Sequence, residues 1–343
     1  MPEIRDGLTL VSRCVLVALL RLDADDWVDG SQVVEEVRRW RTIPSHKVVA
    51  AIIWLAGGVW LKAGHPVCVE WRHKESSAIV ETPNPSQMEC RLTSLGRDML
   101  FIDTLPQTAT TTGDLPNIHS LVPLLLLYGW AGVGWGMACS VLPHNLTELI
   151  KATLTIIRYP MTTARCIPDL YEGGEMDISD YADGHGRIAT KVSICCGDEH
   201  MLVIRALPQY VCAASLMESI RTAANAGTVA VEEVADHSRV EVDIRLRIPA
   251  TMDPLVVKRQ LYSNTECAQT IPCSLMVTRD GKVTTMTVGE LIADHARRML
   301  INSHFTERPH QQKREILDQL DRLEAVHGRK YPRQTRISLG TAR

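Results

Sequence analysis

The chain has 343 residues, of which 45% are apolar and 22% are charged, the composition of an ordinary globular protein with room for two or more domains. Its net charge of −3 argues against a general attraction to polyanions, so any nucleic-acid contact must rest on local clusters of basic residues. Ten cysteines occur singly except for Cys195–Cys196, without CxxC pairs or Cys/His clusters at zinc spacing. This pattern excludes the usual zinc modules and favours a reducing compartment.

The first 80 residues predict two short helices around a tight turn, followed by a β-hairpin. A first amphipathic helix precedes them, and the helices themselves are expected over 31–40, with Ser31 as the N-cap, and over 45–57. A strand at 67–71 and an apolar piece at 78–80 then form a hairpin. A hairpin after a helix-turn-helix is the arrangement of a winged helix.

In a winged helix the second of these two helices enters the major groove of DNA, so His46 and Lys47 in its first turn would reach base edges and phosphates. The basic residues just before that turn are further candidates for phosphate contacts: Arg38, Arg39 and Arg41. The alternative is a small helical bundle that never touches DNA, because residues 1–50 hold seven Lys/Arg against eight Asp/Glu. The pattern by itself leaves both interpretations open.

Residues 121–142 contain no charged residue and are long enough to cross a membrane as a helix. Pro123 and four glycines between 129 and 136 weaken such a helix, and the flanks lack the Lys/Arg asymmetry that orients a span. We therefore expect a buried, glycine-kinked segment and no membrane. The chain also opens without the basic-then-apolar pattern of a secretory signal, so a cytoplasmic location is expected.

The rest of the chain alternates strands and helices. Asn145 caps a helix that Pro160 ends, and two alternating stretches, 188–194 and 201–207, pair as a hairpin. Strict alternation at 239–248 predicts a sheet with one face toward solvent. Further helices are expected near Ser215, Pro254 and Thr287, and a last, coiled-coil-like helix carries Ile316, Leu320, Leu323 and Val326.

This order predicts an α+β protein in four segments. They are a winged-helix-like head at 1–120, a mixed α/β region at 121–285, C-terminal helices at 286–328, and a basic tail at 329–343. The tail has no acidic residue, and we expect it to be disordered, with weak, salt-sensitive phosphate contacts as the alternative.

Four separated stretches carry motifs of one family. EIRDGLTLVSRCVLVAL, from residue 3, is similar to V-R-D-G-L-K-P-V-x-R-R-V-L-Y-A-M. GWAGVGWGMACSVLPHNLTEL, from residue 129, is similar to G-S-x-G-I-A-V-G-M-A-T-x-I-P-P-H-N-L-x-E-L, and LVIRALPQYV, from residue 202, to L-V-I-T-E-L-P-Y-Q-V. A fourth match begins with LYSNTECAQT at residue 261. With these motifs in order from residue 3 to about 327, the chain resembles the A subunits of bacterial type IIA topoisomerases, DNA gyrase and topoisomerase IV.

The resemblance implies a DNA-binding saddle with a winged-helix head and a tower-like α/β domain. It implies that the glycine-rich stretch is a strand and loop facing DNA, where an apolar side chain wedges between base steps and bends the duplex. Val133 occupies that position, and a plain core valine is the alternative. Arg5 and Arg13 lie on family positions that approach the DNA backbone.

The implied partners are double-stranded DNA and either a B-type ATPase subunit or an A-type subunit, in the nucleoid. We expect no cofactor and no metal site in this chain, with Mg²⁺ and ATP supplied through the B-type partner if the assembly is active.

The chain departs from the family where the chemistry takes place. The family's nucleophilic tyrosine lies in A-M-R-Y-T-E-A-R-L, which attacks a phosphodiester, but here the region reads SQMECRLTSLGRDML, which we interpret as a short deletion. No tyrosine precedes Tyr128. The family's H-P-H-G-D is replaced by IPSHK, and its G-x-G-N-F-G loop has no counterpart.

Two hypotheses of different classes follow. The first is a DNA-binding protein that has lost strand cleavage. The second is a divergent, active type II topoisomerase subunit that uses a displaced nucleophile, either Cys90 or Tyr128. A gene product without a selected function is a third interpretation.

Overall fold

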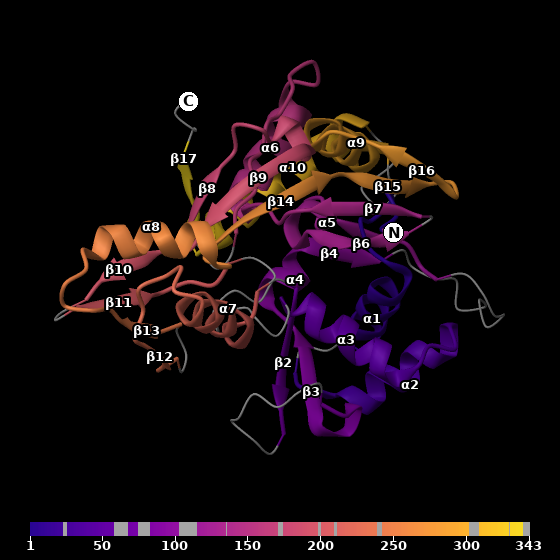
Figure 1. The fold of residues 1–343 in the computed structure, drawn as a ribbon. Helices are drawn as coiled ribbons and strands as arrows, with labels where there is room; N and C mark the ends of the chain where they lie inside the picture. Colours follow the sequence, from indigo (N-terminus) through magenta and orange to yellow (C-terminus); the bar gives the residue numbers. More distant parts are fainter. Residues whose placement is uncertain are drawn as a thin grey trace. The chain divides into compact units, whose positions relative to one another are not determined.

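The computed structural model describes the chain except for residues 23–25, 58–67, 75–82, 103–114, 135, 171–173, 198–199, 209–210, 239–241, 302–308, 329 and 339–343. It divides into two compact units (Figure 1). Unit 1 comprises Met1–Pro168 and Ser274–Pro332, and unit 2 comprises Asp169–Cys273 and Arg333–Arg343. Both contain helices and sheets, so the predicted α+β class is confirmed. The segment boundaries expected at 120, 285 and 328 stay a prediction.

Unit 1 begins with three helices and a three-stranded antiparallel sheet. The helices are α1 (Leu10–Arg21), α2 (Gly30–Trp40) and α3 (Ser45–Leu55), and the strands β1 (Val28–Asp29), β2 (Val69–His73) and β3 (Met88–Leu92) lie in the order β1-β3-β2. Helix α2 is capped by Asp29, which accepts the N–H of Ser31, and the prediction of Ser31 as N-cap is therefore wrong by two residues. Either side chain satisfies the same orphan N–H groups at a helix start.

The partner of β2 differs from the predicted one. The apolar piece at 78–80 lies outside the described residues, whereas the described partner of β2 is β3, which follows the short helix η1 (Pro85–Gln87). Strand β3 lies between β1 and β2, with Cys90 opposite both Val28 and Trp71. The alternation of Met88, Cys90 and Leu92 was hidden because β3 is only five residues long.

The apolar segment 121–142 forms a short helix and a hairpin. Its helix α5 (Leu124–Tyr128) buries all four leucines, and Gly129 then turns the chain into the antiparallel hairpin of β6 (Trp130–Gly134) and β7 (Met137–Val141). Gly129 has a φ of +67°, a conformation that glycine adopts without strain. Among the described residues, no helix is long and apolar enough to cross a membrane.

The remaining elements of unit 1 are short strands and the helices that cover them. They are α4 (Ser94–Met99), β4 (Leu100–Ile102), β5 (Ile118–Ser120), α6 (Leu146–Arg158), β15 (Met276–Arg279), β16 (Lys282–Thr285), α9 (Val288–Ile301) and α10 (Pro309–His327). Asn145 caps α6, and Thr287 and Glu290 form a reciprocal capping box on α9, as predicted.

Helix α10 packs on α6 and α9 within the chain. Its residues Ile316, Leu320 and Leu323 are buried, so the coiled-coil-like stripe has an intramolecular partner. Val326, predicted to continue the stripe, is exposed; His327 is buried in its place and is hydrogen-bonded to Asp98 at 2.9 Å.

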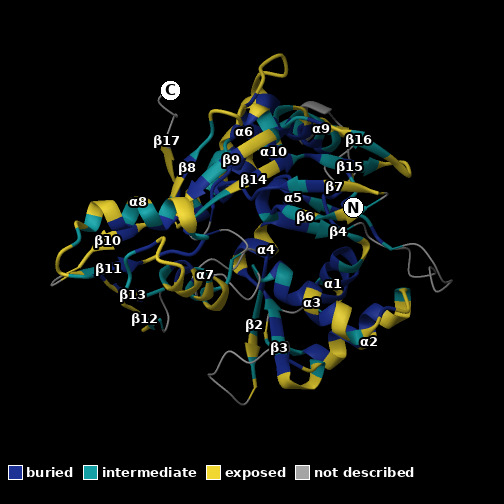
Figure 2. Cartoon of the chain, viewed as in Figure 1, coloured by how far each residue is buried: buried dark blue, intermediate teal, exposed yellow. Residues whose placement is uncertain are grey.

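Unit 2 is built on a four-stranded antiparallel sheet in the order β10 (Ile194–Cys196), β11 (Met201–Ile204), β13 (Ile244–Arg247), β12 (Glu233–Asp236). Helices α7 (Ala213–Asn225) and α8 (Pro254–Asn264) pack on its apolar face, and the opposite face carries Arg245 and Arg247 (Figure 2). The predicted β10–β11 hairpin is confirmed. The N-cap of α8 is Asp253, and that of α7 is Cys212 instead of the predicted Ser215.

A second group of strands completes unit 2. The strands β17 (Arg336–Ser338), β8 (Glu175–Asp177), β9 (His185–Lys191) and β14 (Ala268–Ser274) are neighbours in that order, and η2 (Ala182–Gly184) precedes β9. All ten cysteines are free thiols, in accordance with the absence of a disulfide framework.

The basic tail is ordered from residue 330 to residue 338, so the prediction of a disordered tail is wrong for these residues. Strand β17 pairs in parallel with β8. The carboxylate of buried Asp169 accepts the N–H groups of Gln334 and Thr335 at 2.9–3.2 Å, and Thr335 Oγ1 accepts the N–H of Leu170 at 2.7 Å. These partners lie more than 160 residues upstream in the sequence, which is why composition alone indicated disorder.

We expect Asp169→Ala to open β17 locally, because it leaves two buried N–H groups without an acceptor, at a cost of about 1–3 kcal/mol. Amide hydrogen exchange in residues 334–338 should rise roughly tenfold or more, measured by mass spectrometry. The control is Asp180→Ala, which removes an exposed carboxylate paired with Arg187. Equal protection of β17 in both variants would contradict the role of Asp169.

Candidate nucleic-acid interface

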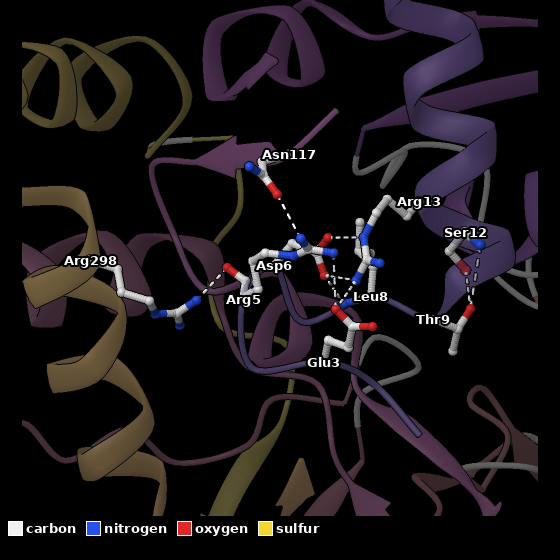
Figure 3. Close-up of polar contacts among 9 residues, drawn as sticks. All are labelled: Glu3, Arg5, Asp6, Leu8, Thr9, Ser12, Arg13, Asn117 and Arg298. Atoms are coloured by element: carbon white, nitrogen blue, oxygen red, sulfur yellow. Dashed lines mark hydrogen bonds and ion pairs between the residues drawn. The ribbon is translucent and has the colours of Figure 1, made fainter. Parts of the chain in front are cut away.

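The N-terminal segment is held by a buried cluster of charges, Glu3, Asp6 and Arg13, here called the N-terminal ion cluster (Figure 3). Arg13 Nε donates to Asp6 Oδ2, and its second terminal nitrogen donates to Asp6 Oδ1 at 2.9 Å and to Glu3 Oε2 at 3.0 Å. The Arg13 side chain is only 2% exposed. Burial lowers the pKa of Arg13, but the hydrogen bonds and charges of Asp6 and Glu3 outweigh it and leave the pKa raised. Arg13 therefore carries its charge inside the fold.

Arg5 lies at the rim of this cluster. Its guanidinium donates to Asn117 Oδ1 at 2.7 Å and to Glu3 Oε2 at 3.1 Å, and its side chain is 45% exposed (Figure 3). Its backbone carbonyl accepts a hydrogen bond from Arg298 of α9. Arg5 thus remains open to an anion on one side, whereas Arg13 has its first role in the structure. The DNA-backbone contacts expected of both residues stay predictions.

The basic residues of α2 and α3 form an exposed surface at the junction of the two helices (Figure 2). Arg38 donates to Ser45 Oγ at 3.2 Å, which connects the end of α2 to the first residue of α3 beside His46 and Lys47. Arg39 is paired with the buried Glu36 at 2.8 Å, so part of its charge is offset. The residues on this surface are Arg38, Arg39, Arg41, His46 and Lys47, all exposed.

The β6–β7 hairpin presents apolar side chains to solvent. Val133 is 76% exposed, which excludes the alternative of a core valine. It lies opposite Ala138, and Met137, which sequence reasoning missed, is also exposed (37%). Gly136, with a φ of +74°, lies in the turn between the strands. Exposed apolar side chains at the end of a hairpin cost solvation and form a surface suited to insertion between apolar groups.

The two candidate nucleophiles are in environments that suppress nucleophilic attack. Cys90 is fully buried, and burial with the nearby charges of Asp29 and Glu89 raises its pKa to about 12. At neutral pH only about one such thiol in 10⁵ is ionised, and the thiolate is the nucleophile. Tyr128 stacks on Trp54 with ring centroids 4.9 Å apart, and its hydroxyl accepts the N–H of Cys68 at 3.0 Å. Trp54 and Cys68 were not singled out from the sequence.

All the predicted site residues lie in unit 1, but the structure joins them only in pairs. Arg5 and Arg13 share Glu3, and Arg38 contacts the start of α3. In the described part of the chain, no group of three or more His, Cys, Asp or Glu side chains is arranged to hold a metal ion. The expectation of no metal and no cofactor stays a prediction.

The fold and these surfaces describe an α+β protein with an exposed basic helix junction and an apolar hairpin tip. A family model of the DNA gyrase/topoisomerase IV A subunits matches residues 115–332, more than half of the chain. The chain belongs to this family.

Three relatives, all of them A subunits, agree with this assignment. The chain is 30% identical over 213 residues to that of DNA topoisomerase 4 from Borreliella burgdorferi, covering 61% of this chain and 34% of that protein. It is 26% identical over 327 residues to that of the chloroplastic/mitochondrial DNA gyrase of Nicotiana benthamiana, covering 85% and 34%. It is 24% identical over 300 residues to that of DNA gyrase from Deinococcus deserti, covering 79% and 36%. The chain spans about a third of the length of these curated relatives.

We expect Arg13→Met to destabilise unit 1 by about 3–5 kcal/mol, because it leaves the Asp6 carboxylate buried without its partner. Arg5→Met, which removes an exposed pair with Glu3, should cost about 0–1 kcal/mol. Urea unfolding followed by far-UV circular dichroism measures both. The double variant Arg13→Met with Asp6→Leu should recover most of the loss, and a small effect of Arg13→Met alone would rule out a structural role for the pair.

Proposed function

We propose that this chain binds and bends double-stranded DNA as a divergent form of the breakage–reunion region of the gyrase/topoisomerase IV A subunits, and that it has lost strand cleavage. The observation that carries the proposal is the 76% exposure of Val133 at the tip of a hairpin inside the segment matched by the family model. An apolar side chain held out in water at that place is suited to wedge between base steps and kink a duplex.

The first 100 residues are proposed as a winged helix. The order α1, β1, α2, α3, β2, β3 and the sheet order β1-β3-β2 support this assignment. In that arrangement α3 is the recognition helix. His46 and Lys47 lie in its first turn, and their exposed side chains make no hydrogen bond or ion pair in the described part of the chain, which supports phosphate or base contacts. Unit 2 is proposed as the counterpart of the tower-like domain.

The loss of cleavage is supported by what occupies the tyrosine's place. The E-A-R-L end of the family motif matches Glu89, Cys90, Arg91 and Leu92, and counting back places Gln87 where the tyrosine stands, without the deletion expected above. Gln87 is exposed at the end of η1, and its side-chain oxygen accepts the N–H of Asn84 at 3.1 Å. A carboxamide has no hydroxyl oxygen to attack phosphorus. The regions of the family's two other motifs lie largely outside the described residues.

Neither displaced nucleophile is favoured by its surroundings. The thiol of Cys90 is neutral and inaccessible at physiological pH, and the hydroxyl of Tyr128 faces the backbone of Cys68 inside the fold. We therefore propose no catalytic residue in this chain. A B-type ATPase subunit or an A-type subunit is the proposed protein partner, with any Mg²⁺ and ATP brought by the B-type subunit, and the nucleoid is the proposed location.

We expect binding to duplex DNA to weaken log-linearly with salt concentration, because backbone contacts release counterions. Lys47→Gln should reduce the slope of log K against log salt by about 1, whereas Lys151→Gln, on the exposed face of α6, should leave it unchanged. A gel-shift salt series measures both slopes. Binding that does not depend on salt, or equal slopes in both variants, would remove the phosphate-contact proposal.

We expect no covalent protein–DNA complex when the chain is incubated with supercoiled plasmid, Mg²⁺, ATP, a poison that traps cleavage and a cognate B-type subunit. Detergent and protease treatment followed by gel electrophoresis detects linear plasmid. Linear DNA attached to this chain would contradict the loss of cleavage, and the variants Cys90→Ala and Tyr128→Phe would then identify the nucleophile.

A further inference from the structure

Tyr128 is placed where three parts of unit 1 meet. It is the last residue of α5, and only Gly129 separates it from the first residue of β6. Its ring stacks on Trp54 near the end of α3, with a centroid distance of 4.9 Å and an interplanar angle of 29°. Its hydroxyl accepts the N–H of Cys68, the residue just before β2, at 3.0 Å. One side chain therefore contacts α3, the start of β2 and the root of the hairpin.

The contacts on the far side of Tyr128 are firmly anchored. The carbonyl of Cys68 accepts the N–H of Thr93 at 3.0 Å, and Gly96 lies so close that a Cβ there would come within 2.4 Å of this carbonyl oxygen. Cys68 is completely buried, and burial raises the pKa of its thiol to about 12 despite the opposing effect of the Tyr128 hydroxyl. The hydroxyl of Tyr128 is thus bonded to a fixed point of the three-stranded sheet.

The hairpin root on the near side is equally tight. A Cβ on Gly129 would approach the carbonyl oxygen of Val141 to 2.7 Å and the nitrogen of Pro143 to 2.8 Å, so the backbone at Gly129 is packed directly on the end of β7. Val141 also pairs with Trp130. A shift of Tyr128 is consequently passed to both strands. The tip at Val133 lies three residues from Trp130, roughly 10 Å along an extended strand, so a small tilt at the root displaces the tip by an ångström or more.

We propose that Tyr128 is a positioning residue that couples the recognition helix α3 to the β6–β7 hairpin, so that Val133 is aimed at the duplex that α3 engages. This inference rests on the proposed function for its DNA part. The coupling itself is a property of the free protein. Tyr128 stands where the family has asparagine, whose side chain is too short to stack on Trp54, so the coupling is a feature of this chain.

The first test uses the free protein. Tyr128→Leu removes both the stack and the hydroxyl, and Tyr128→Phe removes only the hydroxyl. Tyr159→Phe, at a tyrosine that is 66% exposed after α6, is the matched control. Hydrogen exchange followed by mass spectrometry should show residues 129–134 exchanging about tenfold faster in Tyr128→Leu, about threefold faster in Tyr128→Phe and unchanged in the control, with the rest of unit 1 protected as in the wild type.

The second test measures bending. A duplex labelled with donor and acceptor dyes at its two ends reports the bend by energy transfer at saturating protein. Relative to the wild type, the change in transfer should fall at least about twofold in Tyr128→Leu, and Val133→Ala should give a similar loss, whereas Met161→Ala, at an exposed methionine outside the hairpin, should not.

The outcomes separate the two proposals. A wild-type protein that neither binds nor bends the duplex removes the proposed function, while faster exchange at 129–134 in Tyr128→Leu would still support the coupling. A wild type that bends DNA, with unchanged exchange and unchanged bending in both Tyr128 variants, overturns the coupling alone. If Tyr128→Leu fails to fold, the same comparison is made with Tyr128→Phe, where unchanged exchange and bending have the same meaning.

Discussion

The buried ion pair between Arg13 and Asp6 sets the position of everything that the N-terminal segment carries. It holds residues 3–8 against α1, and Asp6 also accepts the N–H of Leu8 at 2.9 Å. Between these contacts Gly7, with a φ of +74°, passes so close to α5 that a Cβ would lie 2.6 Å from the nitrogen of Leu125. Helix α5 ends at Tyr128, so the ion pair, the glycine contact and the hairpin root form one continuous support. A pair of buried charges is costly to place and more costly to break, and this makes it a positional constraint more than a source of stability.

The arginines of unit 1 show how burial divides one residue type into two roles. Arg13 is saturated by carboxylates in the interior, where an additional anion would have to displace Asp6. Arg5 and Arg38 make single side-chain contacts at the surface and keep most of their charge toward solvent. Net charge near zero is compatible with DNA binding when acidic partners are used up inside the fold, because the remaining exposed cations define the local field.

The interpretation as a cleavage-deficient relative depends on the chemistry of three side chains. A glutamine offers no nucleophilic oxygen, the thiol of Cys90 is kept neutral by burial, and the Tyr128 hydroxyl is turned toward the sheet. What remains of the family's machinery is geometry: a helix junction with exposed basic side chains and a hairpin that holds an apolar residue in water. Binding and bending need only these features, since neither process forms a covalent bond.

Local signals in the sequence determined the elements whose causes lie within a few residues of each other. The cap at Asn145, the proline start of α8 and the Thr287–Glu290 box were all predicted, because a cap and the N–H it satisfies are at most three residues apart. The collinear motifs likewise determined the family. Only the tertiary structure decided that Arg13 is buried and Val133 exposed, that 334 and 335 are tied to Asp169, and that Tyr128 meets Trp54 and Cys68. Burial and these pairings depend on residues tens to more than a hundred positions away, and no local pattern records which distant partner closes over a side chain.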